Sequence, residues 1–300
     1  METNRRKFLT LATAGLTSTA LIAGAKPVLA GTAHSGGNAG TRYGMLVDTT
    51  LCVGCRACVV ACKQWNHNPV SPLDDVNKNN TIDTSPLLKA DTFTNIRATE
   101  IKEGTDSKWI YTKLQCMHCE YPACAVACIV GALVKTPNGP VTYDETKCIG
   151  CRYCMTACPF GIPNFEWEKT IPWIRKCTFC ASRQEQGLQP ACSGTCPTGA
   201  LKFGLREDLI AEAKRRIAAD PDNYENYVYG ENEVGGTSWI YLSSVPFEKL
   251  GLNKHIEEPV TVNVQRAMGI IPFVLGGVAV LMSGIYWIAK RRAKQEAGEN

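Results

Sequence analysis

Sixteen cysteines constrain this chain of 300 residues more than any other feature. They fall into four runs of four, with short gaps inside each run and long segments between runs. A chain of this length can bury a core without crosslinks, so the cysteines serve another purpose. The runs, first to fourth, are Cys52, Cys55, Cys58 and Cys62; Cys116, Cys119, Cys124 and Cys128; Cys148, Cys151, Cys154 and Cys158; and Cys177, Cys180, Cys192 and Cys196.

Three kinds of chemistry use cysteines in such numbers: disulfides, zinc sites and iron–sulfur clusters. Disulfides tie distant segments together, whereas thiols two or three residues apart converge on one point, as a metal requires. Pairs of the C-x2-C type also build zinc ribbons. The third run has the spacing C-x2-C-x2-C-x3-C before Pro159, in which the fourth cysteine binds a second 4Fe-4S cluster. The spacing therefore favours clusters over zinc and disulfides.

The four runs belong to two types. Residues 48–58 match residues 144–154 at Asp, Thr, Gly, Arg and each Cys, so the first and third runs are of one type. Residues 124–133 and 192–201 share their cysteines and a Gly-Ala-Leu ending, so the second and fourth runs are of the other type. An internal repeat of this kind indicates a duplicated supersecondary unit.

The repeat predicts which runs share clusters. A two-cluster unit needs one run of each type, and the second and third runs are neighbours joined by a turn at 136–140. The first and fourth runs then pair with each other, and each cluster takes three thiols from one run and one from its partner. The expected 4Fe-4S ligand sets are set one, Cys52, Cys55, Cys58 and Cys196; set two, Cys62, Cys177, Cys180 and Cys192; set three, Cys116, Cys119, Cys124 and Cys158; and set four, Cys128, Cys148, Cys151 and Cys154.

The two ends of the chain predict export and a membrane anchor. Residues 1–30 contain an adjacent arginine pair, an apolar run and a small-residue ending, which together predict a twin-arginine signal peptide. Residues 267–289 carry no charge and, at about 1.5 Å per residue, can cross a hydrocarbon core of about 30 Å. More basic residues follow this segment than precede it. We therefore expect a single-pass protein of the inner membrane, with a cytoplasmic C-terminus and a periplasmic cluster domain.

Short phrases around the cysteines carry a family resemblance. The phrases Gln115-Cys116-Met117-His118-Cys119 and Cys151-Arg152-Tyr153-Cys154-Met155 resemble those of the four-cluster iron–sulfur subunits of bacterial membrane oxidoreductases. The resemblance covers residues 43–245. It is strongest to the hydrogenase-2 iron–sulfur subunit, and the formate dehydrogenase beta subunits are also similar. It implies a non-catalytic electron-transfer subunit with four 4Fe-4S clusters, a catalytic partner that is a nickel–iron hydrogenase or a molybdopterin oxidoreductase, and a quinone-reactive membrane partner.

Charge and motifs argue against other classes. The formal charge is +4, of which residues 1–30 contribute most, so no nucleic-acid footprint is present. The sequence contains no nucleophile constellation and no glycine-rich nucleotide loop, so we do not expect catalysis by this chain alone. A membrane-anchored redox-sensing cluster protein is the alternative class.

Six basic residues lie beside the expected ligands. Four thiolates give an oxidised cluster a charge of about −2, and nearby charges and hydrogen bonds move its reduction potential. We expect these bases to offset that charge. His118 is expected to be a bystander or a hydrogen-bond donor behind the ligands, because its run already supplies four thiols. The six bases are Arg56, Lys63, Lys113, Lys147, Arg152 and Lys176.

These signals predict an α+β fold of two nested, pseudo-symmetric bacterial-ferredoxin-like modules with a C-terminal transmembrane helix. The outer module comprises residues 43–62 and 177–204, the inner module residues 110–165, and residues 63–109 are an insertion. An amphipathic helix is expected over 206–219, where apolar residues recur at helical spacing. The remaining boundaries are a signal peptide at 1–30, linkers at 31–42 and 246–266, an iron–sulfur domain at 43–245, the membrane helix at 267–289 and a cytoplasmic tail at 290–300.

Overall fold

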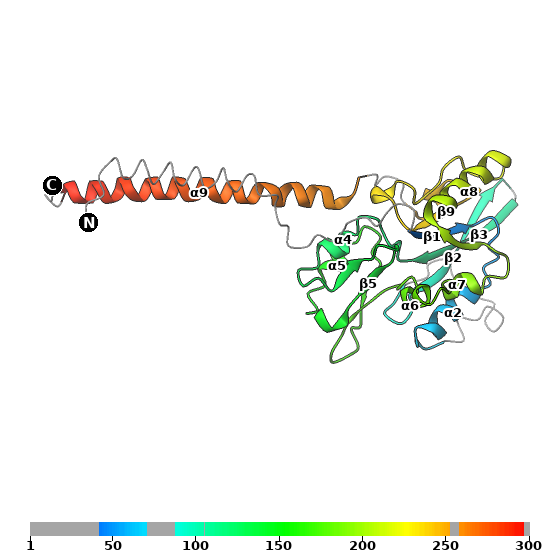
Figure 1. Cartoon of the computed structure of the whole chain (residues 1–300). Coiled ribbons are helices and arrows are strands. Elements are labelled where there is room, and N and C mark those ends of the chain that lie inside the picture. The colour runs from blue at the N-terminus through cyan, green and yellow to red at the C-terminus, as the bar shows by residue number, and fades with distance from the viewer. Residues whose placement is uncertain (1–41, 71–87, 105, 253–257, 297–300) are drawn as a thin grey trace. The chain divides into compact units, whose positions relative to one another are not determined.

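The computed structural model describes residues 42–70, 88–104, 106–252 and 258–296. The predicted signal peptide, nearly all of the linker after it, and residues 71–87 of the predicted insertion lie outside the described residues. The described part consists of a mixed α/β domain and a long C-terminal helix, α9 (Figure 1).

Short strands and short helices alternate through the domain. The strands are β1 (Tyr43–Asp48), β2 (Thr94–Glu103), β3 (Asp106–Gln115), β4 (Leu133–Lys135), β5 (Val141–Tyr143), β6 (Asn164–Phe165), β7 (Ile174–Arg175), β8 (Leu201–Leu205) and β9 (Trp239–Leu242). The helices are α2 (Ala57–Trp65), α4 (Ala123–Val126), α5 (Tyr153–Ala157), α6 (Ala181–Glu185), α7 (Ala191–Gly194), α8 (Arg206–Ala219) and α9 (Val260–Glu296). Three 3-10 helices are η3 (Glu145–Lys147), η4 (Glu233–Gly235) and η5 (Phe247–Leu250).

A three-stranded sheet in the order β8-β1-β9 brings the two ends of the cysteine-bearing region together. Strand β1 is antiparallel to β8, with Val47 opposite Leu201, and parallel to β9, with Val47 opposite Tyr241. Strand β1 leads into the first cysteine run, and β8 follows the fourth. Their pairing therefore places the first and fourth runs at one end of the same sheet.

Helix α8 covers one face of this sheet. Its first turn carries Glu207 and Asp208, which complement the positive end of the helix dipole. Leu209 and Ala213 on its inner side pack against Ile240 and the other side chains of that sheet face. A leucine or isoleucine side chain contributes about 1.5–3 kcal/mol when fully buried. The amphipathic helix predicted over 206–219 is confirmed.

The opposite face of the sheet packs against the cysteine-bearing helices. Met45 and Val47 alternate with the residues that face α8, as the period of two in a strand requires. They belong to a core cluster with Val59 of α2, Phe179 and Trp239, which also contains the thiols of Cys58 and Cys192. Covering both faces explains why all four residues of β9 are buried.

The strand pair β4–β5 has the same register as β1–β8. Leu133 lies opposite Tyr143, five residues after the second run and five before the third, as Leu201 lies opposite Val47 between the fourth and first runs. The predicted turn at 136–140 is confirmed, because the Thr136 amide donates to the carbonyl oxygen of Pro140 at 2.8 Å.

The predicted insertion and the predicted second linker contain more regular structure than we expected. The insertion holds β2, which pairs with β3 over ten residues. In the segment 246–266, η5 is anchored because Phe247 and Leu250 are fully buried, and Leu250 packs against Ile101 and Ile110 of the hairpin. The same segment ends in the first turns of α9.

Helix α9 contains the predicted membrane segment 267–289 within a single longer helix. Residues Phe273–Ala293 are long and apolar enough to cross a membrane by length and composition. Phe273 is 74% exposed and Val280 is 69% exposed. An apolar helix with such side chains in water is unfavourable, so α9 is a candidate membrane anchor.

Candidate metal centres

The first and third cysteine runs follow the same backbone path. Gly54 and Gly150 both have a φ of 70°, and Arg56 and Arg152 are also left-handed, with φ of 57° and 62°. Left-handed residues turn the chain sharply, so that backbone N–H groups point at the sulfur atoms. The Gly150 amide donates to Cys148 Sγ at 3.4 Å. Helices α2 and α5 then begin directly after the two arginines.

Alanine is expected to be tolerated less well at Gly54 than at Gly150. Both substitutions incur the left-handed penalty of about 1–2 kcal/mol. A Cβ atom at Gly54 would lie 2.5 Å from the Tyr111 ring, whereas at Gly150 the nearest atom, of Phe165, is 3.8 Å away. Gly54→Ala is therefore expected to lower the thermal unfolding midpoint, measured by circular dichroism, further than Gly150→Ala. Equal decreases would contradict the close packing of Tyr111.

The second and fourth runs achieve the same turn without glycine. His118 and Phe179 occupy the position before the second cysteine, with φ of 47° and 53°. The Phe179 amide donates to Cys177 Sγ at 3.3 Å. The two rings pack against each other with centroids 5.1 Å apart. Strained non-glycine residues of this kind persist only where the surrounding structure holds them.

The thiols of set one surround a small cavity. Burial raises the pKa of Cys52, the Gly54 amide lowers it, and the nearby thiols of Cys196 and Cys55 raise it further. Burial likewise raises the pKa of Cys58 to about 12. All four thiols line one cavity, together with Lys113.

The thiols of set two gather around the C-terminal end of α2. Burial raises the pKa of Cys62 to about 12, with Lys113 lowering it and Cys192 and Cys180 raising it. Burial raises the pKa of Cys177 well above its usual value, and the thiol of Cys62 raises it further.

The thiols of set three come from the second and third runs. Burial raises the pKa of Cys119 well above its usual value, and the thiols of Cys116, Cys124 and Cys158 raise it further. Burial raises the pKa of Cys158, and backbone amides, among them that of Ile162, lower it. The raised pKa values of Cys119, Cys124 and Cys158 favour the protonated thiol, so binding a metal through thiolates would release protons.

The thiols of set four lie beside the β4–β5 pair, called here the inner hairpin, whose Leu133 and Val141 share a buried cluster with Cys128, Cys148 and Cys154. Burial, together with the thiols of Cys128, Cys148 and Cys151, raises the pKa of Cys154 to about 11. The Ala132 amide donates to Cys128 Sγ at 3.2 Å. In each set the thiols lie near enough to affect one another's pKa values, and all sixteen cysteines are free thiols.

The four sets follow one another in a row. Set one borders set two, set two borders set three, and set three borders set four. At each border, a thiol of one set lies in the same buried cluster as a thiol of the next and raises its pKa. The thiols that meet in this way are Cys58 and Cys192, Cys177 and Cys116, and Cys124 and Cys154.

The structure separates the six basic residues that the sequence places beside the ligands. Lys147 and Arg152 are exposed, whereas the other four are buried. Lys176 donates to the carbonyl oxygen of Val141 at 2.5 Å. Burial alone would lower the pKa of Lys113, but the thiols of Cys192 and its neighbours raise it above its usual value.

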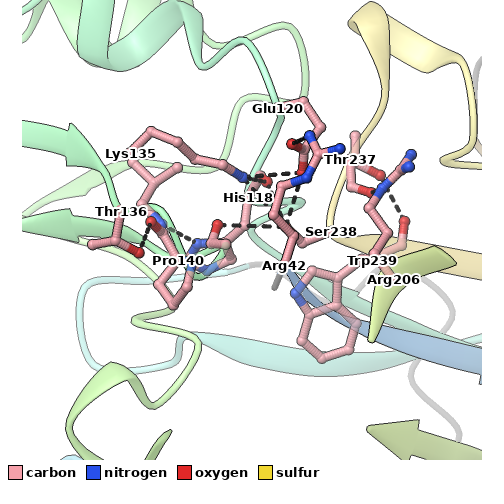
Figure 2. Close-up of polar contacts among 12 residues, drawn as sticks. Arg42, His118, Glu120, Lys135, Thr136, Pro140, Arg206, Thr237, Ser238 and Trp239 are labelled. Carbon is pink, nitrogen blue, oxygen red and sulfur yellow. Dashed lines mark hydrogen bonds and ion pairs between the residues drawn. The ribbon is translucent and has the colours of Figure 1, made fainter. Parts of the chain in front are cut away.

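His118 is fully buried at the centre of a polar network that joins the inner hairpin to β9 (Figure 2). Its Nδ1 atom accepts a hydrogen bond from the Val141 amide at 2.8 Å. Its carbonyl oxygen accepts from Lys135 Nζ at 2.9 Å and from Ser238 Oγ at 3.1 Å. Burial, Lys176 and Lys135 hold the pKa of His118 well below its usual value. The neutral ring therefore carries its proton on Nε2, a buried atom beside the backbone of Cys177.

Sequence reasoning missed the charged part of this network. Lys135 Nζ lies 3.2 Å from Glu120 Oε1, and Arg42 Nη1 lies 2.6 Å from Glu120 Oε2 (Figure 2). The paired lysine and arginine hold the pKa of Glu120 below its usual value although burial alone would raise it. None of these residues stands in a cysteine run except Glu120, which directly follows Cys119, and no spacing in the sequence indicates that the three would meet.

Comparison with known proteins places these features in a family. A family model described as a 4Fe-4S dicluster domain matches residues 107–206. A protein of Nitratidesulfovibrio vulgaris is 42% identical over 99% of this chain and 80% of its own length. Hydrogenase-2 operon protein HybA of Escherichia coli is 36% identical over 84% of each chain. The formate dehydrogenase iron–sulfur subunit of Haemophilus influenzae is 39% identical over 66% of this chain and 63% of its own length.

Proposed function

The chain belongs to the family of ferredoxin-like 4Fe-4S dicluster proteins that includes HybA and the formate dehydrogenase iron–sulfur subunits, and we propose that it carries electrons within an oxidoreductase complex. The chain would bind four 4Fe-4S clusters, and it would lie between a catalytic subunit and a quinone-reactive membrane subunit. It would perform no catalysis by itself. The observation that supports this proposal most strongly is the row of four thiol sets.

The residues present fit four 4Fe-4S clusters. Each set offers four thiols, which is the number that a 4Fe-4S cluster takes. The backbone amides that donate to Cys128, Cys148 and Cys177 Sγ are the kind of hydrogen bond that stabilises thiolate ligands and tunes a cluster. A bound 4Fe-4S cluster supplies one-electron redox chemistry. The row of thiol sets supports the order one, two, three, four along the electron path.

Two nested modules would hold these clusters. The outer module pairs β1 with β8, and the inner module pairs β4 with β5 in the same register. Further support comes from Asp48 and Asp144. Each carboxylate accepts hydrogen bonds from the amide and the hydroxyl of the threonine two residues later. The backbone amide of each aspartate donates at 2.8 Å to the carbonyl oxygen of an alanine that follows a cysteine run, Ala200 for Asp48 and Ala132 for Asp144.

The catalytic partner that we favour is a nickel–iron hydrogenase. HybA, named as a hydrogenase-2 operon protein, matches 84% of this chain, whereas the Haemophilus formate dehydrogenase subunit matches 66%. The apolar part of α9 and the predicted twin-arginine signal support a single-pass location in the inner membrane with a periplasmic cluster domain. A formate dehydrogenase or another molybdopterin oxidoreductase is the second candidate.

Purification of the detergent-solubilised complex from native membranes tests this proposal. We expect a hydrogenase catalytic subunit to co-purify, and hydrogen, but not formate, to produce the electron paramagnetic resonance (EPR) signals of reduced clusters in this chain. Reduction by formate alone would assign the chain to a formate dehydrogenase. Recovery of the chain with its clusters but without any catalytic subunit would contradict electron transfer and favour the redox-sensing class.

A further inference from the structure

We propose that Lys113 sets the reduction potentials of the clusters in sets one and two together, as a buried positive charge that both clusters share. The inference rests on the proposed function, because it concerns clusters in the two sets. One residue would thus affect two of the four clusters along the electron path. The clusters of sets three and four would be free of this charge.

The position of Lys113 places its charge between the two sets. The side chain comes from β3 and is 2% exposed. It lines the cavity formed by the four thiols of set one. Its charge also acts on Cys62, Cys177 and Cys192 of set two. Among the described residues that line this cavity, no thiol belongs to set three or set four.

The ammonium group is held by neutral partners. Lys113 Nζ donates to Thr94 Oγ1 and to Gln115 Oε1, the latter at 3.1 Å. The ring of Trp239 lies 4.7 Å from Nζ. Gln115 is itself oriented by a hydrogen bond of 2.5 Å from its Nε2 atom to the hydroxyl of Tyr241. These contacts fix the position of the charge without cancelling it.

A second buried lysine, Lys135, has the counter-charge that Lys113 lacks among the described residues. Lys135 is 7% exposed at its side chain and is paired with Glu120 at 3.2 Å. For Lys113, no carboxylate within the described part of the chain forms an ion pair. Burying an ammonium group without a counter-charge is costly. The negative charge of two thiolate-bound clusters would offset this cost and stabilise the unpaired lysine.

The effect on the potentials follows from Coulomb's law. Reduction of a cluster adds one electron, taken from the donor of the electron path, and no proton is needed. A fixed positive charge in a buried, low-dielectric site stabilises the added negative charge more than it would in water. Net charge near a cluster is among the factors that set its potential. Lys113 is therefore expected to raise the potentials of both neighbouring clusters.

The test uses Lys113→Met in the full chain with its clusters bound. Redox titration followed by EPR is expected to show two of the four potentials falling, each by at least a tenfold change in the equilibrium constant for reduction, or about 59 mV for a one-electron couple. Lys147→Met is the control, because Lys147 also lies beside a cysteine but is exposed and paired with Asp144 at 3.1 Å. In the Lys147→Met variant, all four cluster potentials are expected to shift by less than about 59 mV.

A second variant keeps the test decisive if Lys113→Met loses iron. Gln115→Glu leaves the lysine in place and puts a carboxylate beside it, so the same two potentials are expected to fall. Unchanged potentials, or an equal shift of all four, would overturn the inference. Iron content separates the two proposals: a native chain without clusters defeats the proposed function, whereas full iron with unshifted potentials in both variants defeats only the role of Lys113.

Discussion

Cys116→Ala and Cys158→Ala are expected to abolish the same EPR component, although the two cysteines belong to different runs. The reason is that the fourth thiol of a run serves the cluster of its partner run, so both residues would belong to set three. The structure places these two thiols close enough for Cys116 to raise the pKa of Cys158. The native chain is expected to contain about sixteen irons, from four clusters of four. Each variant would lose about four of them, or keep three at the altered site and show a three-iron signal.

Cys154→Ala is the matched control for this pair. Cys154 belongs to the same run as Cys158, so a cluster built from one run alone would lose the same component in both variants. We expect instead that Cys154→Ala removes a different component, that of set four. The double variant Cys116→Ala with Cys158→Ala should lose the irons of one cluster only, about four. Additive loss would contradict the exchange of ligands between runs.

Asp48→Ala is expected to destabilise the domain strongly. Asp48 is 1% exposed, and its carboxylate accepts from Arg216 Nη1 at 2.9 Å and from the Tyr224 hydroxyl at 2.8 Å. The Thr50 amide and hydroxyl are also donors to it. Loss of these bonds to a buried charge costs about 3 kcal/mol, which corresponds to a fall of roughly 10 °C in the unfolding midpoint.

Asp144→Ala is the control, because Asp144 holds the equivalent position before the third run. It keeps the same contacts with Thr146, but its ion pair is with Lys147 in an exposed position. Water screens such a pair, so the fall in the midpoint should be clearly smaller. Circular dichroism measured on both variants decides the matter. Equal falls would show that the Asp48 network does not hold β1 to α8 and to the segment that contains Tyr224.

Local patterns were the most predictable part of this protein. The helix over 206–219 and the turn at 136–140 depend on residues a few positions apart, and both were predicted correctly. The segment 246–266 was harder to predict because Leu250 packs against the distant β2–β3 hairpin, and Phe247 packs against the rings of Tyr227 and Tyr229. A short apolar pattern does not reveal what it will pack against.

For the basic residues too, the local sequence determined the position in the chain, and long-range packing decided the surroundings. Lys113 and Lys147 look alike in the sequence, since each lies near a cysteine run. Strand β3 buries Lys113 between two thiol sets, whereas Lys147 lies in an exposed turn. Glu120 and Lys135 likewise meet only because the inner hairpin folds back on the second run. Contacts of this kind depend on long-range pairing, which no short motif encodes.

The sequence by itself determined the grouping of sixteen cysteines, their two types and the membership of the family, because metal-ligand spacing is set by residues two to four positions apart. Only the tertiary structure decided how the groups meet. The placement of β1 between β8 and β9 joins the first run to the fourth, and a buried cluster brings Cys116 to Cys177. These contacts connect residues far apart in the chain. They put four thiol sets in a row and left one buried lysine between two of them.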